Sequence, residues 1–200
     1  MDSEPSLPEG IDSILQQPCA FQLDSEASPR RDKDNHLLVL IPATVDGAPF
    51  TLSKLGDLAK QRFPNNEEGY RFYSSYVRNA VGSKQLPHAP CWLLLTRDVL
   101  SGSRNKSYSA QKEMVGRHAR VGYRLPHALE AATGILLYHA RTGERLLGDA
   151  PWTYTRCQEL IAYKGNHYPA VVGRFSSEGL DVHGSPSDDY YNGVLCCRKF

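Results

Sequence analysis

The residues best suited to recognition chemistry lie in one segment near the carboxyl end, from His183 to Asn192. The segment has no aliphatic residue, yet valine and leucine flank it on both sides, which predicts a loop held between two strands. Tyrosine offers rigid contact area at low entropic cost, while Ser, Asn and Gly offer adaptable hydrogen bonds. We therefore predict a binding surface with two tyrosines as aromatic anchors. The expected contact residues are His183, Ser185, Ser187, Asp188, Asp189, Tyr190, Tyr191, Asn192 and, from outside the loop, Trp152.

Two alternatives stay open for this segment. Gly, Ser, Pro, Asp and Asn also favour turns for purely conformational reasons, so the loop could be an ordinary solvated connection. Trp152 and Tyr154 could border the site or pack beneath it.

Other side chains capable of chemistry lack the spacing of known sites, so we expect no metal and no cofactor. Asp181, Asp188 and Asp189 could hold calcium, but solvated carboxylates are the preferred interpretation. Residues 102–107 place basic side chains at a helix start but lack the second glycine of a phosphate-binding loop, so we interpret them as a capped loop. Paired spacing typical of zinc ligands is missing from His118, His127, His139 and His167.

Composition limits the class of protein. The 200 residues suit one domain, and 23 basic against 22 acidic side chains give a net charge of +1, which does not favour nucleic acid or an anionic membrane as a partner. The sequence contains no apolar run of about 20 residues and no basic-then-apolar leader. An odd number of cysteines, five, is typical of reduced thiols. The sequence predicts a cytoplasmic protein of undefined oligomeric state.

The amino-terminal half offers fewer signals than the rest. Residues 1–35 are polar and predict a mobile tail, with an arm packed through Phe21 and Leu23 as the alternative. A single domain is expected over residues 36–200, opening with a buried strand at 37–41. Helices are predicted from Thr51 to Lys60 and over 67–80.

The carboxyl-terminal half predicts strands and helices in separate blocks. A strand is expected at 91–96, followed by helices over 107–119 and from Pro126 to just before Gly143. Short strands should follow in an antiparallel meander, which indicates an α+β fold. Their expected positions are 153–155, 170–172, 180–182 and 193–195.

Two segments resemble a known fold family. Residues 122–126, Gly-Tyr-Arg-Leu-Pro, lead into a helix containing Glu130-Ala131-Ala132, and this resembles the second helix of sulfatase-modifying-factor-like proteins, a branch of the C-type-lectin fold. The stretch 171–176 and the ending 193–200 are similar to a degenerate form of that family's carboxyl terminus. The resemblance covers about residues 105–200 and implies two helices packed on a twisted antiparallel sheet.

The resemblance implies two functions. The fold family includes variable ligand-binding proteins of diversity-generating retroelements, in which adenines of Asn codons are mutated; every residue type in 183–192 can be reached from AAC in that way. We therefore predict a non-enzymatic protein that binds a protein or other macromolecular ligand. One alternative is a formylglycine-generating oxidase, whose relatives use a pair of cysteines with copper, or a degenerate relative of that enzyme. Because Cys196 and Cys197 are adjacent, we expect one buried and one exposed thiol instead. Another alternative is an intracellular interaction module whose amino-terminal half contacts a second protein.

Overall fold

The computed structural model describes residues 5–24, 31–63, 70–72, 77–84, 87 and 89–200, and the statements below concern these residues. The helices are α1 (Ile11–Gln16), α2 (Asp32–Asn35), α3 (Leu52–Arg62), the π-helical turn η1 (Arg78–Gly82), α5 (Tyr108–Gly116), the 3-10 turn η2 (Ala119–Val121) and α6 (Ala128–Thr142). The strands are β1 (His36–Ile41), β2 (Thr44–Val45), β3 (Ala48–Pro49), β4 (Tyr70–Phe72), β5 (Cys91–Thr96), β6 (Tyr123–Arg124), β7 (Tyr154–Tyr163), β8 (Asn166–Ser176), β9 (Gly179–Gly184), β10 (Asn192–Gly193) and β11 (Cys197–Lys199).

These strands form two main sheets. One has the order β1-β5-β11-β6 and is antiparallel throughout. The other has the order β10-β7-β8-β9-β4, in which β7, β8 and β9 form the expected antiparallel meander, while β10 and β4 pair in parallel at its two edges. The fold class is therefore α+β, as the sequence predicts. The two edge strands lie far from their sheet neighbours in sequence.

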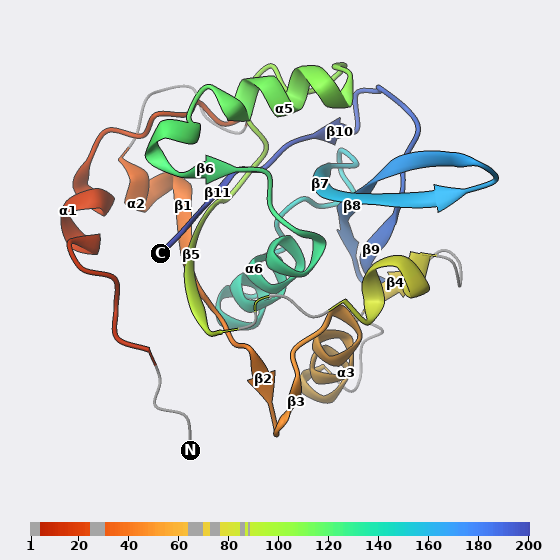
Figure 1. The fold of residues 1–200 in the computed structure, drawn as a ribbon, viewed down its shortest axis with the longest axis horizontal. Coiled ribbons are helices and arrows are strands. Elements are labelled where there is room, and N and C mark those ends of the chain that lie inside the picture. The colour runs from red at the N-terminus through yellow and green to blue at the C-terminus, as the bar shows by residue number, and fades with distance from the viewer. Residues whose placement is uncertain (1–4, 25–30, 64–69, 73–76, 85–86, 88) are drawn as a thin grey trace.

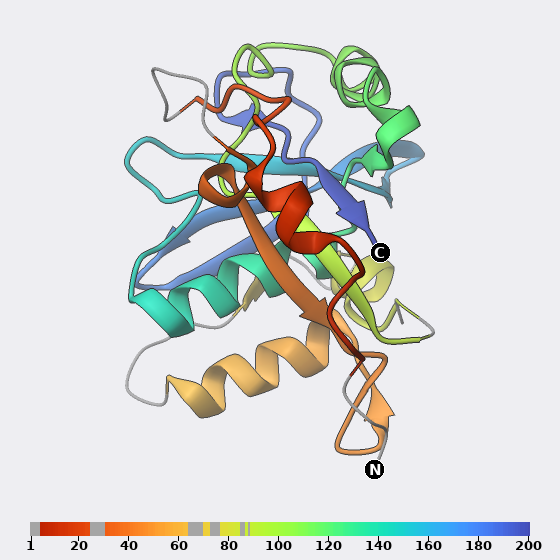
Figure 2. The ribbon, with the colours of Figure 1, turned by 90° about the vertical axis from the view of Figure 1, so that its left-hand side faces the viewer.

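Helix α6 lies between the two sheets (Figure 1), with β1 and β5 on one side and β7 to β9 on the other. Helix α3 runs beside α6 on the side away from α5, and the view turned by 90° shows the same arrangement (Figure 2). In α6, ten of the residues between Ala128 and His139 are buried. One apolar cluster thus joins α6 to both sheets and α3. Burial of this continuous apolar surface is the main source of the fold's stability.

Local sequence signals explain the helix ends. The Thr51 hydroxyl accepts a hydrogen bond from the Lys54 amide at 3.2 Å, and Ser107 caps α5 in the same way at Ala110. Helix α6 ends at Gly143, whose φ of 77° is the left-handed conformation that glycine adopts readily. Its first residue is Ala128, two positions later than a start at Pro126. Both helices of the carboxyl-terminal half are therefore confirmed with small shifts at their ends.

The first 35 residues require a correction where the structure describes them. Phe21 and Leu23 are buried against the carboxyl-terminal strand region and α5, so residues 5–24 and 31–35 form a packed arm rather than a mobile tail. Two aromatic rings enclose Phe21: its centroid lies 4.5 Å from that of His118 and 4.8 Å from that of Tyr123. Residues 1–4 and 25–30 lie outside the described part. The polar composition was misleading because three apolar residues of this segment, Ile11, Phe21 and Leu23, are buried.

The helix predicted over 67–80 is also wrong in part. Residues 70–72 form β4, which pairs with β9, and residues 78–82 form a π-helical turn. The remainder of that range, 67–69 and 73–76, lies outside the described residues. The helical spacing of tyrosines and a valine indicated a helix. The backbone groups at the edge of β9 offered a competing partner, and residues 70–72 pair with that edge as a strand. Among the described helices, none combines the length and apolar character that crossing a membrane requires.

Candidate functional site

The segment from His183 to Asn192 leaves β9 and returns through β10, beside the start of β7, and a buried arginine holds it in place. Arg156 on β7 is 1% exposed, and its guanidinium donates to the Lys106 carbonyl at 2.9 Å and the Gln111 Oε1 at 3.0 Å. It also donates to the Ser187 carbonyl and to the Asp188 carboxylate, the latter at 2.8 Å. One side chain thus connects the loop to β7, α5 and the segment before α5.

Asn192 forms the second anchor and is 3% exposed. Its Nδ2 donates to Ser185 Oγ at 3.0 Å, to the Ser187 carbonyl at 3.0 Å and to Asp189 Oδ1 at 2.8 Å. Its carbonyl accepts from Gln111 Nε2 at 2.9 Å. Asn192 and Ser185 were expected to contact a ligand, but both are buried, so their role is to shape the loop.

Three aromatic side chains form the exposed part of the site. Trp152, Tyr190 and Tyr191, here called the aromatic patch, are 43%, 52% and 41% exposed. The ring centroids of Trp152 and Tyr191 are 5.5 Å apart, and those of Tyr190 and Tyr191 are 6.1 Å apart. Arg174 lies over Trp152, with its guanidinium carbon 4.1 Å from the ring centroid. The prediction that Trp152 borders the loop agrees with this placement, whereas Tyr154 is buried beneath it.

The remaining expected contact residues divide between the surface and the interior. Ser187 and Asp188 are exposed, although Asp188 also pairs with Arg156. Asp189 Oδ1 accepts from the Tyr191 amide at 3.1 Å, which fixes the turn before the patch. His183 is half-buried and lies edge-on to Tyr154, at 5.0 Å between centroids. Burial lowers the pKa of His183, and Asp181 partly opposes that shift.

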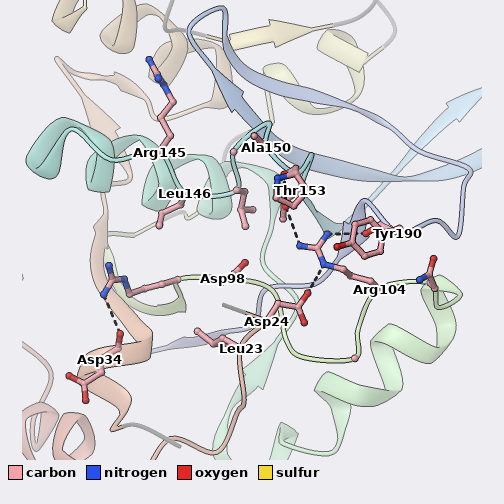
Figure 3. A pocket seen from close by; sticks show the side chains of 16 residues that line it. Leu23, Asp24, Asp34, Asp98, Arg104, Arg145, Leu146, Ala150, Thr153 and Tyr190 are labelled. Atoms are coloured by element: carbon pink, nitrogen blue, oxygen red, sulfur yellow. Dashed lines mark hydrogen bonds and ion pairs between the residues drawn. The ribbon is translucent and has the colours of Figure 1, made fainter. Parts of the chain in front are cut away.

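A cleft of about 940 Å³ opens beside the patch and was not foreseen from the sequence. Arg104 lies in its wall beside Tyr190 (Figure 3) and joins three distant segments. Its Nε donates to Asp24 at 2.5 Å, and its other nitrogens donate to the Tyr190 carbonyl at 2.9 Å and Thr153 Oγ1 at 3.1 Å. The guanidinium carbon also lies 5.2 Å from the Tyr190 ring centroid. Tyr190 is therefore shared between the patch and the wall of the cleft.

The cleft is polar and balanced in charge. Its lining includes three carboxylates, Asp24, Asp34 and Asp98, and three guanidinium groups, Arg97, Arg104 and Arg145. Apolar contact is confined to short stretches such as Leu23 and the 146–148 turn. A lining of this kind suits a polar surface carrying both signs of charge better than a small apolar molecule. No local sequence signal could have found it, because its walls come from the arm, the 97–105 segment and the turn before β7.

The cysteines near the carboxyl end correct another expectation. Cys196 and Cys197 point to opposite sides of the β-sheet, as expected, yet both are fully buried. The reason is that apolar clusters cover both faces: Cys197 packs with α6, and Cys196 packs with the amino-terminal arm and α5. Burial raises the pKa of both thiols well above the ordinary value. Neither is poised as a thiolate for catalysis or metal binding.

The carboxylates considered for calcium are engaged with protein groups. Asp181 is 1% exposed and lies 3.3 Å from Arg174 and 3.4 Å from the Tyr154 hydroxyl, while Asp188 and Asp189 bind the anchors described above. Within the described residues, one group of potential metal ligands does converge, and the sequence analysis missed it: Cys19, Asp32 and His36. The only local signal was the i, i+4 spacing of Asp32 and His36.

Comparison with known proteins leaves the chain without an assigned family. No family model matches the sequence, and neither a curated protein nor a solved structure is similar to it.

Proposed function

We propose that this protein binds a protein or other macromolecular ligand through the aromatic patch and the adjoining cleft, on a scaffold of the C-type-lectin type. The proposal rests on the contrast between buried and exposed residues in the loop from His183 to Asn192. Its buried residues, Ser185 and Asn192, make many internal hydrogen bonds, while Tyr190 and Tyr191 project from it with about half of their surface exposed. Exposure of large aromatic rings to water is energetically unfavourable, and a binding role explains why these rings are exposed.

Rigidity supports the same conclusion. The buried anchors Arg156 and Asn192 hold the loop backbone before any ligand arrives, so little conformational entropy remains to be lost on binding. Tyrosine and tryptophan surrounded by adaptable polar groups are the composition of antibody combining sites. An exposed aromatic patch beside a polar cleft matches a macromolecular surface with both apolar and charged parts.

The resemblance to variable proteins adds a proposed origin for the loop. We suggest that a retroelement diversifies the exposed positions. The scaffold would tolerate this because side chains that point into solvent can change without loss of packing. Ser187, Tyr190 and Tyr191 are exposed, whereas Arg156, from outside the loop, is buried, and the exposed Asp188 pairs with it and should vary less. Sibling gene copies should therefore differ at the exposed codons, by changes at adenines, and a reverse transcriptase with a template repeat should lie nearby. Uniform copies without such neighbours would contradict the proposed origin but leave binding untouched.

Ligand capture provides the direct test. Tyr190→Ala/Tyr191→Ala should recover none of the partners that the wild-type protein retains from an extract of its source cells, while its Tm stays unchanged because both rings are exposed. The matched control is Tyr163→Ala, which removes an exposed tyrosine on the β7–β8 hairpin. Quantitative mass spectrometry of the retained proteins gives the readout. Equal recovery by the double variant would refute binding through the patch.

A formylglycine-generating oxidase is the alternative from another class. That chemistry uses accessible cysteine thiolates with copper, and burial with raised pKa values at Cys196 and Cys197 makes them poor candidates. We therefore favour a non-enzymatic role. Copper-dependent oxidation of a thiol peptide by the purified protein would reverse this preference.

A further inference from the structure

The amino-terminal arm meets the start of β1 at a cluster of three metal-ligating side chains. Cys19 comes from the arm, Asp32 from α2 and His36 from the first position of β1. One ligand atom from each lies within 4.8 Å of the other two. The Asp32 carboxylate lies 3.4 Å from His36 Nδ1, and Cys19 Sγ lies 4.0 Å from the same nitrogen. Three segments of the chain therefore converge on one point.

One oxygen of the carboxylate in this cluster lacks a hydrogen-bond partner. Asp32 is 6% exposed, and its Oδ1 makes no hydrogen bond. The nearest basic group is the His36 ring, whose Nδ1 lies 3.4 Å from this oxygen. A buried carboxylate oxygen without a hydrogen-bond partner is unfavourable, and a cation bound beside it would satisfy it.

We propose that Cys19, Asp32 and His36 bind a zinc ion that fastens the amino-terminal arm to the domain. With zinc–ligand bonds of about 2.0 Å to nitrogen and oxygen and about 2.3 Å to sulfur, tetrahedral coordination separates nitrogen from oxygen by about 3.4 Å and nitrogen from sulfur by about 3.6 Å. The first separation matches the 3.4 Å observed between His36 and Asp32. The second requires Cys19 to approach by a few tenths of an ångström from its 4.0 Å, and Cys19 is the only partly exposed member.

The residue behind His36 completes the site. Tyr123 Oη lies 3.2 Å from His36 Nε2, on the side of the ring away from the cluster. With the proton on Nε2, the imidazole donates to Tyr123 and presents the Nδ1 lone pair to the metal. Without metal, Nδ1–H can instead donate to the Asp32 carbonyl at 3.1 Å. Zinc must therefore displace this hydrogen bond and shift the tautomer.

Zinc binding must also release a proton from Cys19. Burial raises the pKa of this thiol to about 11, so the free protein holds it protonated. Coordination favours the thiolate, and the proton leaves to solvent. The role we assign to the site is structural, because its three protein ligands clamp the arm to the start of β1, and water would occupy the fourth tetrahedral position. This inference is independent of the proposed ligand binding.

The test measures zinc in the full-length protein carrying a tag without histidines. After dialysis against zinc and removal of the excess, elemental analysis should find about one zinc per chain in the wild type and in His167→Gln, a control that removes an exposed histidine. Cys19→Ser and His36→Gln should retain almost none. Cobalt in place of zinc should give sulfur-to-metal charge-transfer absorption that Cys19→Ser abolishes.

Two further measurements distinguish a loss of zinc binding from a loss of folding. Zinc should raise the Tm of the wild type but not that of Cys19→Ser, whose half-exposed side chain leaves the core intact. Tyr123→Phe keeps the ring but removes the partner of Nε2, and should weaken zinc binding by about 10-fold to 100-fold in a chelator competition. A wild-type protein without bound zinc, or a Cys19→Ser protein that still holds one equivalent, would overturn the proposal.

Discussion

A guanidinium that is almost completely excluded from water is tolerated only where its charge and its N–H groups find partners. The two terminal nitrogens of Arg156 meet this condition through Asp188, two carbonyls and an amide oxygen, whereas its buried Nε makes no hydrogen bond. If the guanidinium were removed, the Ser187 carbonyl would keep Asn192 as a donor, while the Lys106 carbonyl and Gln111 Oε1 would lose the arginine. The conformation of the loop from His183 to Asn192 consequently depends on a residue that lies outside it and is not exposed to a ligand.

Arg156→Ala should lower the free energy of unfolding by about 2–4 kcal/mol, because it leaves the Lys106 carbonyl and Gln111 Oε1 without their donor, while water can solvate the exposed Asp188. Urea denaturation provides the measurement. Arg117→Ala is the matched control: its pair with Glu113 is exposed on both sides and should contribute less than about 1 kcal/mol. A similar cost for both variants would show that Arg156 is not an anchor.

The buried histidines predict how stability depends on pH. Burial lowers the pKa of His36 and of His183 below the ordinary value of 6.5, although Asp32 and Asp181 respectively oppose the shift. The unfolded chain therefore takes up more protons than the folded one as the pH falls below 6.5. Stability contributed by the neutral histidines is complete above that pH and is lost toward the lowered folded pKa values.

We expect a lower urea midpoint at about pH 5.5 than at about pH 7.5, with an unchanged m-value. His183→Gln should reduce the difference between the two midpoints, since glutamine does not titrate. The control, His167→Gln, changes an exposed histidine and should leave the difference unaltered. An equal difference in wild type and His183→Gln would rule out His183 as a contributor.

At the scale of elements, the pairing of β7 with β8 places the aromatic patch. Gly173 faces Tyr154 across the two strands, has a φ of 156°, and lies where the β8–β9 register shifts. Arg174 follows with a φ of 44°, and this local distortion brings its side chain over Trp152. A glycine is required because a Cβ at position 173 would lie 2.7 Å from Tyr154 Cα and closer still to the Thr153 carbonyl.

Gly173→Ala should therefore destabilise the protein by about 2–3 kcal/mol, through backbone strain and a clash that only backbone movement can relieve. Gly116→Ala serves as the control, since a Cβ there meets nothing within 4 Å at the end of α5. Chemical denaturation of both variants checks the prediction. Equal free energies of unfolding for the two variants would show that the close approach of β7 and β8 does not require a glycine at position 173.

At the scale of the whole molecule, the amino-terminal arm packs against the segment that leads to the carboxyl terminus. Phe21 and Leu23 share an apolar cluster with Val194 and Cys196, so this part of the arm packs against the segment that precedes β11. The marked ends of the chain themselves lie apart (Figures 1 and 2). The same arm brings Asp24 to Arg104 in the wall of the cleft (Figure 3). Segments about 170 residues apart in sequence therefore define both the second core and part of the candidate site.

Phe21→Ala should lower the free energy of unfolding by about 3–5 kcal/mol, as expected for a large aromatic ring removed from a core. The comparison is Leu7→Ala in the same arm, where the side chain is 60% exposed and should contribute less than about 0.5 kcal/mol. Thermal and urea unfolding measure both. No loss of stability in Phe21→Ala would indicate that the arm behaves as the mobile tail its composition suggests.

Local sequence determined those parts of the protein whose signals lie within about ten residues. The strands at 37–41 and 91–96, the Thr51 and Ser107 caps, and the glycine that ends α6 were all predictable, because propensity, capping and periodicity act locally. The loop between β9 and β10 was recognisable for the same reason. Its aromatic and polar residues fall between two short strands.

Only the tertiary structure decided which of those residues face solvent and what surrounds them. Ser185 and Asn192 turned out to be buried and Tyr190 exposed, although all belong to one polar segment. The parallel edge strands, the packed arm, the second buried cysteine and the cleft around Arg104 likewise depend on segments distant in sequence. Burial depends on how the sheets and helices assemble. Neither the type of a residue nor its spacing specifies which distant segment will cover that residue.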